Sequence, residues 1–351
     1  MATASLRGQA APSMPADIDA LYPDLAALYR DLHRNPELGF QETRTAATLA
    51  ARLRSLGYEV TTGVGGTGIV ALLRNGQGPT AMLRTELDAL PVEEKTGAPF
   101  ASTVTAKNTA GQTVPVMHAC GHDLHMAAWA GTAAWMATHR QLWKGTLMLV
   151  GQPAEETVSG AAAMLKDGLF QRFPKPDFVL GLHDDDTLPA GTIGYHPGFF
   201  RAAMASPVIT IFGRGGHGAM PQNTVDPVVM AARTVLTLQT IVARENNPLE
   251  PVVVTVGSIH GGTQGNIIPD QVKLELSVRM FTEEARQRVL ASIERIVKAE
   301  ALAAGAPRAP LVEFANAGVT AVFNDPALTN RLASALRTAM GPQRVERCPR
   351  R

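Results

Sequence analysis

Residues 118–125 read HACGHDLH and place three histidines, one cysteine and one aspartate within eight positions. Thiolate sulfur and imidazole nitrogen are preferred ligands of zinc and other first-row divalent ions, so Cys120 and His122 are candidate metal ligands. A cysteine close to a histidine is also the arrangement of a nucleophile with its base. A buried cysteine beside an unrelated histidine would need no function at all. The Cys-x-His spacing alone leaves these interpretations open.

Other ionisable side chains follow short apolar runs that are bounded by glycine or proline, as buried strands are. Asp88 follows AMLRTEL, Glu155 and Glu156 follow GTLMLVGQPA, and His183 ends FVLGLH. Sites in open α/β sheets form beyond the carboxyl ends of the strands, so we expect these segments to converge with the histidine cluster on one sheet edge. Together they supply cysteine, histidine and glutamate. This set favours a metal site over a nucleophilic dyad or a closed structural zinc site.

The elements that must position these side chains alternate between helix and strand up to about residue 200. Apolar residues at helical spacing predict helices, and short apolar runs predict buried strands. The expected helices are 23–38, 42–58, 124–140 and 161–170, and the expected strands are 66–76, 80–91, 145–152 and 176–183. This alternation predicts an α/β domain with a mixed, largely parallel sheet flanked by helices.

The pattern changes after residue 200. Asp226 followed by Pro227 is typical of a helix start, and Thr282 is the expected N-cap of a second helix. The expected order is strand 206–218, helix 228–245, strands 251–261 and 271–281, and helix 283–305. This β-α-β-β-α order predicts an inserted α+β domain. We therefore expect a disordered tail at 1–18, a metal-binding catalytic domain at 19–203 and 307–351, and a lid and dimerisation domain at 204–306.

The composition is that of an ordinary globular protein, with 45% hydrophobic residues, 18% charged residues and a net charge of +1. This balance gives no electrostatic reason to expect nucleic acid or a membrane as a partner. No apolar run reaches the roughly 18 residues of a membrane helix, and the first residues contain no apolar core of a secretory signal. With only two cysteines, Cys120 and Cys348, we expect a reducing, cytoplasmic setting.

Seven motifs give the chain a family resemblance. In order they are DLHRNPELGFQE, LDALPVEEKTG, VMHACGHDLH, KGTLMLVGQPAEE, GLH, GRGGHGAMP and NIIPDQVKLELSVR. Over roughly residues 20–340 the chain resembles the M20 metallopeptidase family, in its amidohydrolase branch of hippurate, N-acyl-amino-acid and auxin-conjugate hydrolases. The resemblance implies a two-metal catalytic domain, a lid domain that forms a homodimer, and a small N-acyl amino acid as substrate. A dipeptidase or carboxypeptidase of the same family is the alternative.

The resemblance also implies a role for each matching residue. The metal ligands would be Cys120, His122, Glu156 and His183. Glu155 would be the general base, Asp88 would support the site, and the lid residues His217, Asn266 and Arg279 would contact the substrate. The ions would be one or two of Mn²⁺ or Zn²⁺, with Co²⁺ or Ni²⁺ also suitable. Asp123 and His125 are expected to orient ligands or to cap the helix.

This assignment fits the chemistry of amide hydrolysis. Metal coordination lowers the pKa of a water molecule by several units, which makes it nucleophilic near neutral pH. Glu155 could accept the proton of that water and pass it to the leaving amine. His217, in a glycine-rich loop, could stabilise the oxyanion, and losing such a donor costs ~10²–10³ in rate.

The sequence departs from the family pattern at three places. Glu86 stands where relatives usually have aspartate, and Asp184, Asp185 and Asp186 follow the GLH motif in place of an apolar segment. The sequence ends in GPQRVERCPRR, where relatives continue to a last metal-binding histidine. From this we expect an incomplete catalytic domain. The alternative function is therefore an impaired or inactive remnant that binds metal or ligand.

Overall fold

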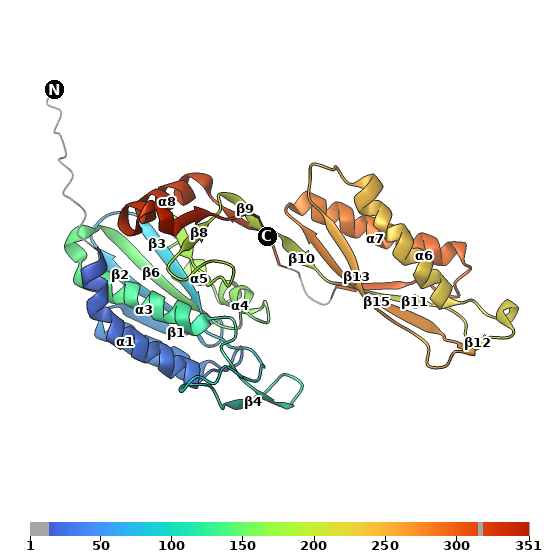
Figure 1. Cartoon of the computed structure of the whole chain (residues 1–351), viewed down its shortest axis with the longest axis horizontal. Helices are drawn as coiled ribbons and strands as arrows, with labels where there is room; N and C mark the ends of the chain where they lie inside the picture. The colour runs from blue at the N-terminus through green and yellow to red at the C-terminus, as the bar shows by residue number, and fades with distance from the viewer. Residues whose placement is uncertain (1–13, 315–318, 351) are drawn as a thin grey trace, which may run out of the picture. The chain divides into compact units, whose positions relative to one another are not determined.

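The computed structural model describes residues 14–314 and 319–350, and these divide into two compact units between Pro189 and Ala190 (Figure 1). Residues 1–13 of the predicted tail lie outside the described residues. From Met14 onward the chain is helical, so the expected limit at residue 18 is wrong. Pro15 is compatible with this earlier start because a proline is tolerated in the first turn of a helix. Among the described residues, no helix is both long and apolar enough to cross a membrane.

The first unit consists of a five-stranded sheet, a small hairpin and helices. Its helices are α1 (Met14–Arg34), α2 (Thr43–Ser55), α3 (His122–Thr138), α4 (Gly160–Lys166) and α5 (Leu169–Arg172), with a 3-10 turn at Arg140–Leu142. The strands of its sheet are β1 (Glu59–Val64), β2 (Gly68–Asn75), β3 (Thr80–Glu86), β6 (Gly145–Gln152) and β7 (Phe178–Gly181). The hairpin pairs β4 (Thr105–Lys107) with β5 (Thr113–Pro115).

The sheet of the first unit is mixed, in the order β1-β2-β6-β3-β7. Strand β3 runs parallel to both β6 and β7, whereas β2 runs antiparallel to both β1 and β6. The mixed α/β class is confirmed, but the parallel pairs do not outnumber the antiparallel ones. A short turn joins β1 to β2, and such a turn can connect only antiparallel strands. Since β3, β6 and β7 share one direction, their carboxyl ends lie at the same sheet edge.

Helices cover both faces of this sheet. Helices α1, α2 and α3 bury Leu28, Leu49 and Trp129 against one face, and α4 and α5 bury Met164 and Leu169 against the other. The first six residues of β2 are therefore all buried, as expected of a strand covered on both sides. Helix α3 is also fixed to the sheet by a hydrogen bond, because the Trp129 indole N–H donates to the carbonyl of Leu83 at 3.1 Å.

The described residues of the second unit form an antiparallel sheet, short strand pairs and three helices. The strands of the sheet are β10 (Ala203–Ala205), β11 (Pro207–Phe212), β13 (Val253–His260), β15 (Gln271–Met280) and β16 (Leu311–Phe314). The short pairs join β8 (Ile193–Tyr195) to β18 (Val345–Arg347), β9 (Gly198–Arg201) to β17 (Val322–Asn324), and β12 (Gly216–His217) to β14 (Ile267–Ile268). The helices are α6 (Pro227–Thr240), which continues as a π turn at Ile241–Glu245, α7 (Glu283–Ala303) and α8 (Pro326–Met340), and 3-10 turns lie at Pro221–Asn223 and Pro342–Arg344.

The expected β-α-β-β-α order is present in this unit as β11, α6, β13, β15 and α7. Both predicted helix starts are confirmed, because the side chain of Asp226 accepts the N–H of Val228 at 2.8 Å and Thr282 accepts that of Ala285 at 3.1 Å. One face of the sheet packs against α6 and α7 in a continuous apolar core. Strand β16 also pairs with β11, so the inserted sheet extends to Phe314, beyond the expected limit at 306.

The last described segment returns to the residues that precede the inserted sheet. Strand β18 pairs with β8 in parallel, and β17 pairs antiparallel with β9. The carbonyl of His196 accepts a hydrogen bond from Asn324, and His196 itself contacts the carbonyl of Cys348 at 2.6 Å. Strands β17 and β18 fall within the second compact unit together with the inserted sheet. That the residues after Phe314 belong with residues 19–203 to one catalytic domain therefore remains our proposal.

Candidate metal centre

Four segments of the first unit bring ionisable side chains to one edge of its sheet. Asp88 follows β3, Glu155 and Glu156 follow β6, and His183 follows β7. The fourth segment is the turn before α3, which carries Cys120, and His122 is the first residue of that helix. The common direction of β3, β6 and β7 thus brings together the residues that the sequence placed at strand ends.

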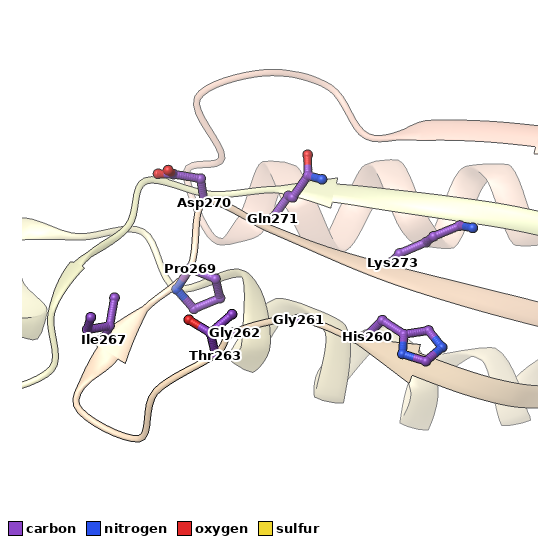
Figure 2. A pocket seen from close by; sticks show the side chains of 9 residues that line it. All are labelled: His260, Gly261, Gly262, Thr263, Ile267, Pro269, Asp270, Gln271 and Lys273. Atoms are coloured by element: carbon purple, nitrogen blue, oxygen red, sulfur yellow. The ribbon is translucent and has the colours of Figure 1, made fainter.

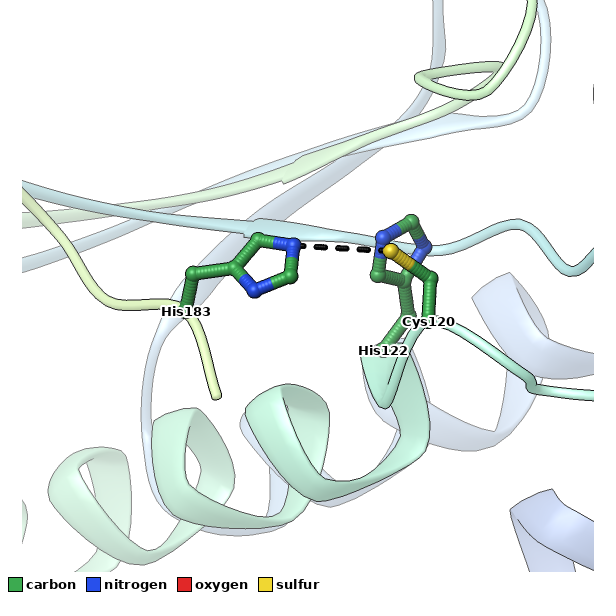
Figure 3. Close-up of side chains that lie close together, drawn as sticks. All are labelled: Cys120, His122 and His183. Carbon is green, nitrogen blue, oxygen red and sulfur yellow. Dashed lines mark hydrogen bonds between the residues drawn. The ribbon is translucent and has the colours of Figure 1, made fainter. Parts of the chain in front are cut away.

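Cys120, His122 and His183 lie close together at this edge (Figure 3). The Cys120 Sγ is 3.5 Å from the His183 Nε2, and one ligand atom from each of the three residues lies within 4.8 Å of the others. Gly121 makes the turn between the first two, with a φ of 73°. A β-carbon there would lie 2.7 Å from the Asp184 carboxyl carbon, and the positive φ also favours glycine in this turn.

His122 also faces two carboxylates. Its Nδ1 lies 2.8 Å from the carbonyl oxygen of Asp88, to which it donates, and this leaves Nε2 as the nitrogen with a lone pair. The Nε2 atom lies 3.8 Å from an oxygen of Glu155 and 3.8 Å from Glu156 Oε1. The spacing of His122 Nε2 and Glu156 Oε1 suits one ion held between these two atoms, because zinc-to-nitrogen and zinc-to-oxygen distances are about 2.0–2.2 Å.

Three buried polar atoms of this cluster lack a hydrogen-bond partner among the described residues. They are Asp88 Oδ1, His122 Nε2 and Glu156 Oε1. A buried donor or acceptor without a partner costs about 1–3 kcal/mol, so such atoms seldom lie together without a purpose. All three offer lone pairs, and the neighbouring Cys120 offers a sulfur. The residues therefore fit a divalent transition-metal ion.

The electrostatics of the cluster favour a bound cation. The nearby imidazoles of His122 and His183 lower the pKa of the Cys120 thiol, which favours the thiolate. Burial lowers the pKa of His122, but the neighbouring Asp88 and Cys120 side chains outweigh this effect and raise it to about 11. Burial raises the pKa of Glu156. Protons thus neutralise a negative pocket that a divalent ion could neutralise instead.

His125 and Asp184 lie next to the candidate ligands, and of these two residues only His125 was predicted to orient a ligand. The His125 Nε2 accepts the backbone N–H of Asp184 at 2.8 Å, and its Nδ1 lies 3.1 Å from Glu86 Oε2. Burial raises the pKa of Glu86, but the hydrogen bond from His125 and the charge of Arg84 lower it to about 2. His122 and His125 are three residues apart and therefore share one face of α3. This spacing is the sequence pattern that indicates that His125 lies beside the candidate ligand His122.

Asp123 holds the start of α3 through contacts with Leu124 and His33. Its side chain accepts the N–H of Leu124 at 2.9 Å, as expected for a carboxylate at a helix N-terminus. It also lies 2.6 Å from the Nδ1 of His33, whose Nε2 is 3.0 Å from Glu94. The sequence analysis did not single out His33. Its partners lie 61 and 90 residues away, so no local pattern indicates them.

The predicted lid residues lie in the second unit, and the structure brings two of them together. His217 is in β12, which pairs with β14, and the neighbouring Gly218 N–H donates to the Asn266 carbonyl at 2.8 Å. Arg279 lies near the far end of β15, exposed and opposite Val253. Arg279 is therefore not part of the His217–Asn266 pair.

A pocket of about 470 Å³ lies beside this strand pair (Figure 2). It is lined by His260, Gly261, Gly262, Thr263, Ile267, Pro269, Asp270, Gln271 and Lys273. None of these residues belongs to the candidate metal centre. The pocket is therefore a feature of the inserted sheet, next to the loop that carries Asn266.

Known proteins resemble the chain over most of its length. The model of Peptidase family M20/M25/M40 matches residues 82–350. N-acetyl-L-cysteine deacetylase of Bacillus subtilis (strain 168) is 36% identical over 332 residues, which are 93% of this chain and 75% of that protein. Hippurate hydrolase of Campylobacter jejuni is 37% identical over 282 residues, which are 79% of this chain and 70% of that protein.

A solved structure of a similar protein also has a similar fold. The YXEP protein of Bacillus subtilis, described as a dinuclear metal binding peptidase from the M20 family, superposes with a TM-score of 0.77 at 31% identity. The superposition covers 95% of this chain and 83% of that one. The range matched by the family model contains every residue of the candidate metal centre.

Proposed function

The chain belongs to peptidase family M20/M25/M40 and is a metal-dependent amidohydrolase, and we propose that it hydrolyses the amide bond of small N-acyl amino acids. The observation that carries the proposal is the cluster of unpartnered buried atoms on Asp88, His122 and Glu156, beside the Cys120 thiol. The names of two relatives, a deacetylase of N-acetyl-L-cysteine and a hippurate hydrolase, support this substrate class.

We assign metal binding to Cys120, His122, Glu156 and His183, with one or two ions of Mn²⁺ or Zn²⁺. A bound ion supplies a water molecule whose pKa lies near 7. Two of these residues are fixed in place, because His122 is held by the Asp88 carbonyl and Glu156 by its backbone. The Glu156 N–H donates to Asp88 Oδ2 at 2.9 Å, so the aspartate supports both ligands.

The two adjacent glutamates differ in exposure, which supports different roles. The Glu155 side chain is 39% exposed and that of Glu156 is 19% exposed, with one oxygen fully buried in the cluster. The buried carboxylate suits a ligand. The exposed carboxylate can accept a proton from water and donate it to the leaving amine, as a general base and then acid.

The lid residues are assigned to the substrate. His217 would stabilise the oxyanion, Asn266 would donate a hydrogen bond to the substrate, and Arg279 would bind a carboxylate. The proximity of His217 and Asn266 supports a joint role for these two, whereas Arg279 has no such support. A homodimer through the inserted sheet is also part of the proposal, because edge strands such as β13 readily pair with another chain.

The test is turnover of N-acetyl-amino acids and of hippurate by protein loaded with Mn²⁺ or Zn²⁺. Dipeptides serve as the second substrate class, because the family and the solved relative are described as peptidases. Glu155→Gln is the control for contaminating hydrolases. Preferential cleavage of dipeptides would replace the proposed substrate class with the peptidase alternative. Equal turnover by Glu155→Gln and the unmodified protein would show that Glu155 is not the general base.

A further inference from the structure

The turn that carries Glu155 and Glu156 has an unusual backbone. Ala154, directly before them, has a φ of 46°, in the left-handed region that residues other than glycine seldom adopt. Its carbonyl accepts the N–H of Gly160 at 3.1 Å, which closes the turn around it. Such a conformation persists only when the surrounding structure holds it. The contacts of Ala154 therefore determine where the two glutamates stand.

The strongest of these contacts comes from a distant carboxylate. Glu42 is fully buried, and its Oε1 accepts the Ala154 N–H at 2.7 Å from 112 residues away in the chain. Its other oxygen accepts the hydroxyl of Thr67. Glu42 is also the N-cap residue of α2, and its carbonyl accepts the N–H of Ala46 at 3.0 Å. The carboxylate is thus fixed to a helix rather than to a loop.

Neighbouring backbone packs closely around Ala154. Ala154 is itself fully buried, and a β-carbon at Gly39 would lie 3.1 Å from its Cα and Cβ atoms. A β-carbon at Gly160 would lie 1.5 Å from the carbonyl oxygen of Pro153. The backbone that enters the glutamate pair is therefore enclosed on two sides, and Glu42 supplies the acceptor for its N–H.

We infer that Glu42 is a positioning residue, which acts through Ala154 to set the placement of the Glu155–Glu156 pair at the metal centre. The inference rests on the proposed function of that pair. Two carboxylates then hold the short segment, since Glu42 accepts the N–H of Ala154 and Asp88 accepts the N–H of Glu156 at 2.9 Å.

The test compares Glu42→Met with two matched variants. Methionine fills the space of the side chain but accepts no strong hydrogen bond. Glu42→Gln keeps an acceptor for Ala154, and Thr67→Val removes the other hydrogen bond of the carboxylate while leaving that of Ala154. Hydrogen exchange of the peptide 153–160 in metal-free protein reports on the turn independently of activity. The absorption spectrum of the Co²⁺ form and the hydrolysis rate report on the centre.

We expect Glu42→Met to increase exchange in 153–160, to change the Co²⁺ spectrum, and to lower kcat about 10–100-fold, as is typical for partners of metal ligands. Glu42→Gln and Thr67→Val should be close to the unmodified protein in exchange, in the Co²⁺ spectrum and in kcat. Unchanged exchange and an unchanged spectrum in Glu42→Met would overturn the inference. If that variant does not fold, fast exchange of the Ala154 amide in the unmodified protein would overturn it instead, and slow exchange would support it.

The two proposals fail in different ways. If Glu155→Gln is inactive while Glu42→Met keeps a native turn and full activity, the positioning role is wrong and the proposed function stands. If Glu42→Met loosens the turn and changes the Co²⁺ spectrum, but neither variant alters hydrolysis, the positioning of the turn stands and the role of the glutamates is wrong.

Discussion

The backbone N–H of Asp184 points at the Nε2 of His125 at 2.8 Å, and the Asp184 Oδ1 lies 3.2 Å from the same nitrogen. The other ring nitrogen, Nδ1, lies 3.1 Å from Glu86 Oε2. Asp184 directly follows His183, a candidate ligand. His125 thus connects helix α3, strand β3 and the end of β7 through a single ring. A histidine that orients its neighbours in this way is a common companion of metal ligands.

We predict that His125→Phe weakens metal binding about 10–100-fold. The aromatic ring preserves the volume, but Glu86 and the Asp184 N–H both lose their contact with His125, so the loop with His183 loosens. Competition with a chromogenic chelator measures the affinity. His139→Phe, just beyond the other end of α3, is the control and should bind metal normally. Equal affinity of both variants would contradict the orienting role.

The adjacent glutamates should give two distinct phenotypes. Glu155→Gln is expected to keep its metal and to lose ~10²–10⁴ in turnover, because it removes a proton acceptor without removing a ligand. Glu156→Gln is expected to lose metal as well, because it replaces a buried ligand by a neutral amide. Elemental analysis alongside initial rates separates the two. The opposite pattern would reverse the assignment of base and ligand.

Local patterns were sufficient to predict much of the fold. Asp226 and Thr282 begin their helices as expected, because an N-cap depends only on the next few residues. The convergence of Asp88, His183 and the glutamates followed from a general rule about strand ends, once the strands had been recognised. Such features depend on short stretches of sequence or on topology, and both can be inferred from one chain.

Long-range contacts could not be predicted in this way. Helix α1 runs through Pro23, where the sequence indicated a helix start, and strand β16 joins the inserted sheet through pairing with β11. Glu42 resembles an ordinary surface glutamate at the start of a helix, yet it is fully buried against Ala154. These contacts join segments that are distant in the chain, so no local periodicity reveals them.

Metal should stabilise the folded protein through Cys120. An ion that binds only the native state adds about 2.7 kcal/mol when its free concentration is 100 times the Kd. We therefore expect Zn²⁺ to raise the thermal unfolding midpoint of the apoprotein, and EDTA to reverse the effect. Cys120→Ser replaces the thiolate by a weak ligand and should reduce the shift. A full shift in Cys120→Ser would exclude the thiol as a ligand.

The last prediction concerns the pH dependence of stability at His33. Burial lowers the pKa of this imidazole, but hydrogen bonds to Glu94 and Asp123 outweigh that effect, and the folded pKa is above the usual 6.5. A raised pKa means that the protonated form stabilises the fold. The stabilisation that protonated His33 gives to the fold is fully present below the pKa that His33 has in the unfolded chain. It is lost as the pH rises through the pKa that His33 has in the folded protein.

We therefore expect His33→Phe to be more destabilising at pH 6 than at pH 9. The aromatic ring suits the contacts with Tyr29 and Phe100, so the loss at pH 6 should be about 1–3 kcal/mol, the cost of leaving buried acceptors without a donor. Urea unfolding at both pH values measures the difference. His260→Phe, at an exposed position, should show no such pH dependence. A greater loss for His33→Phe at pH 9 would show that the neutral imidazole is the stabilising form.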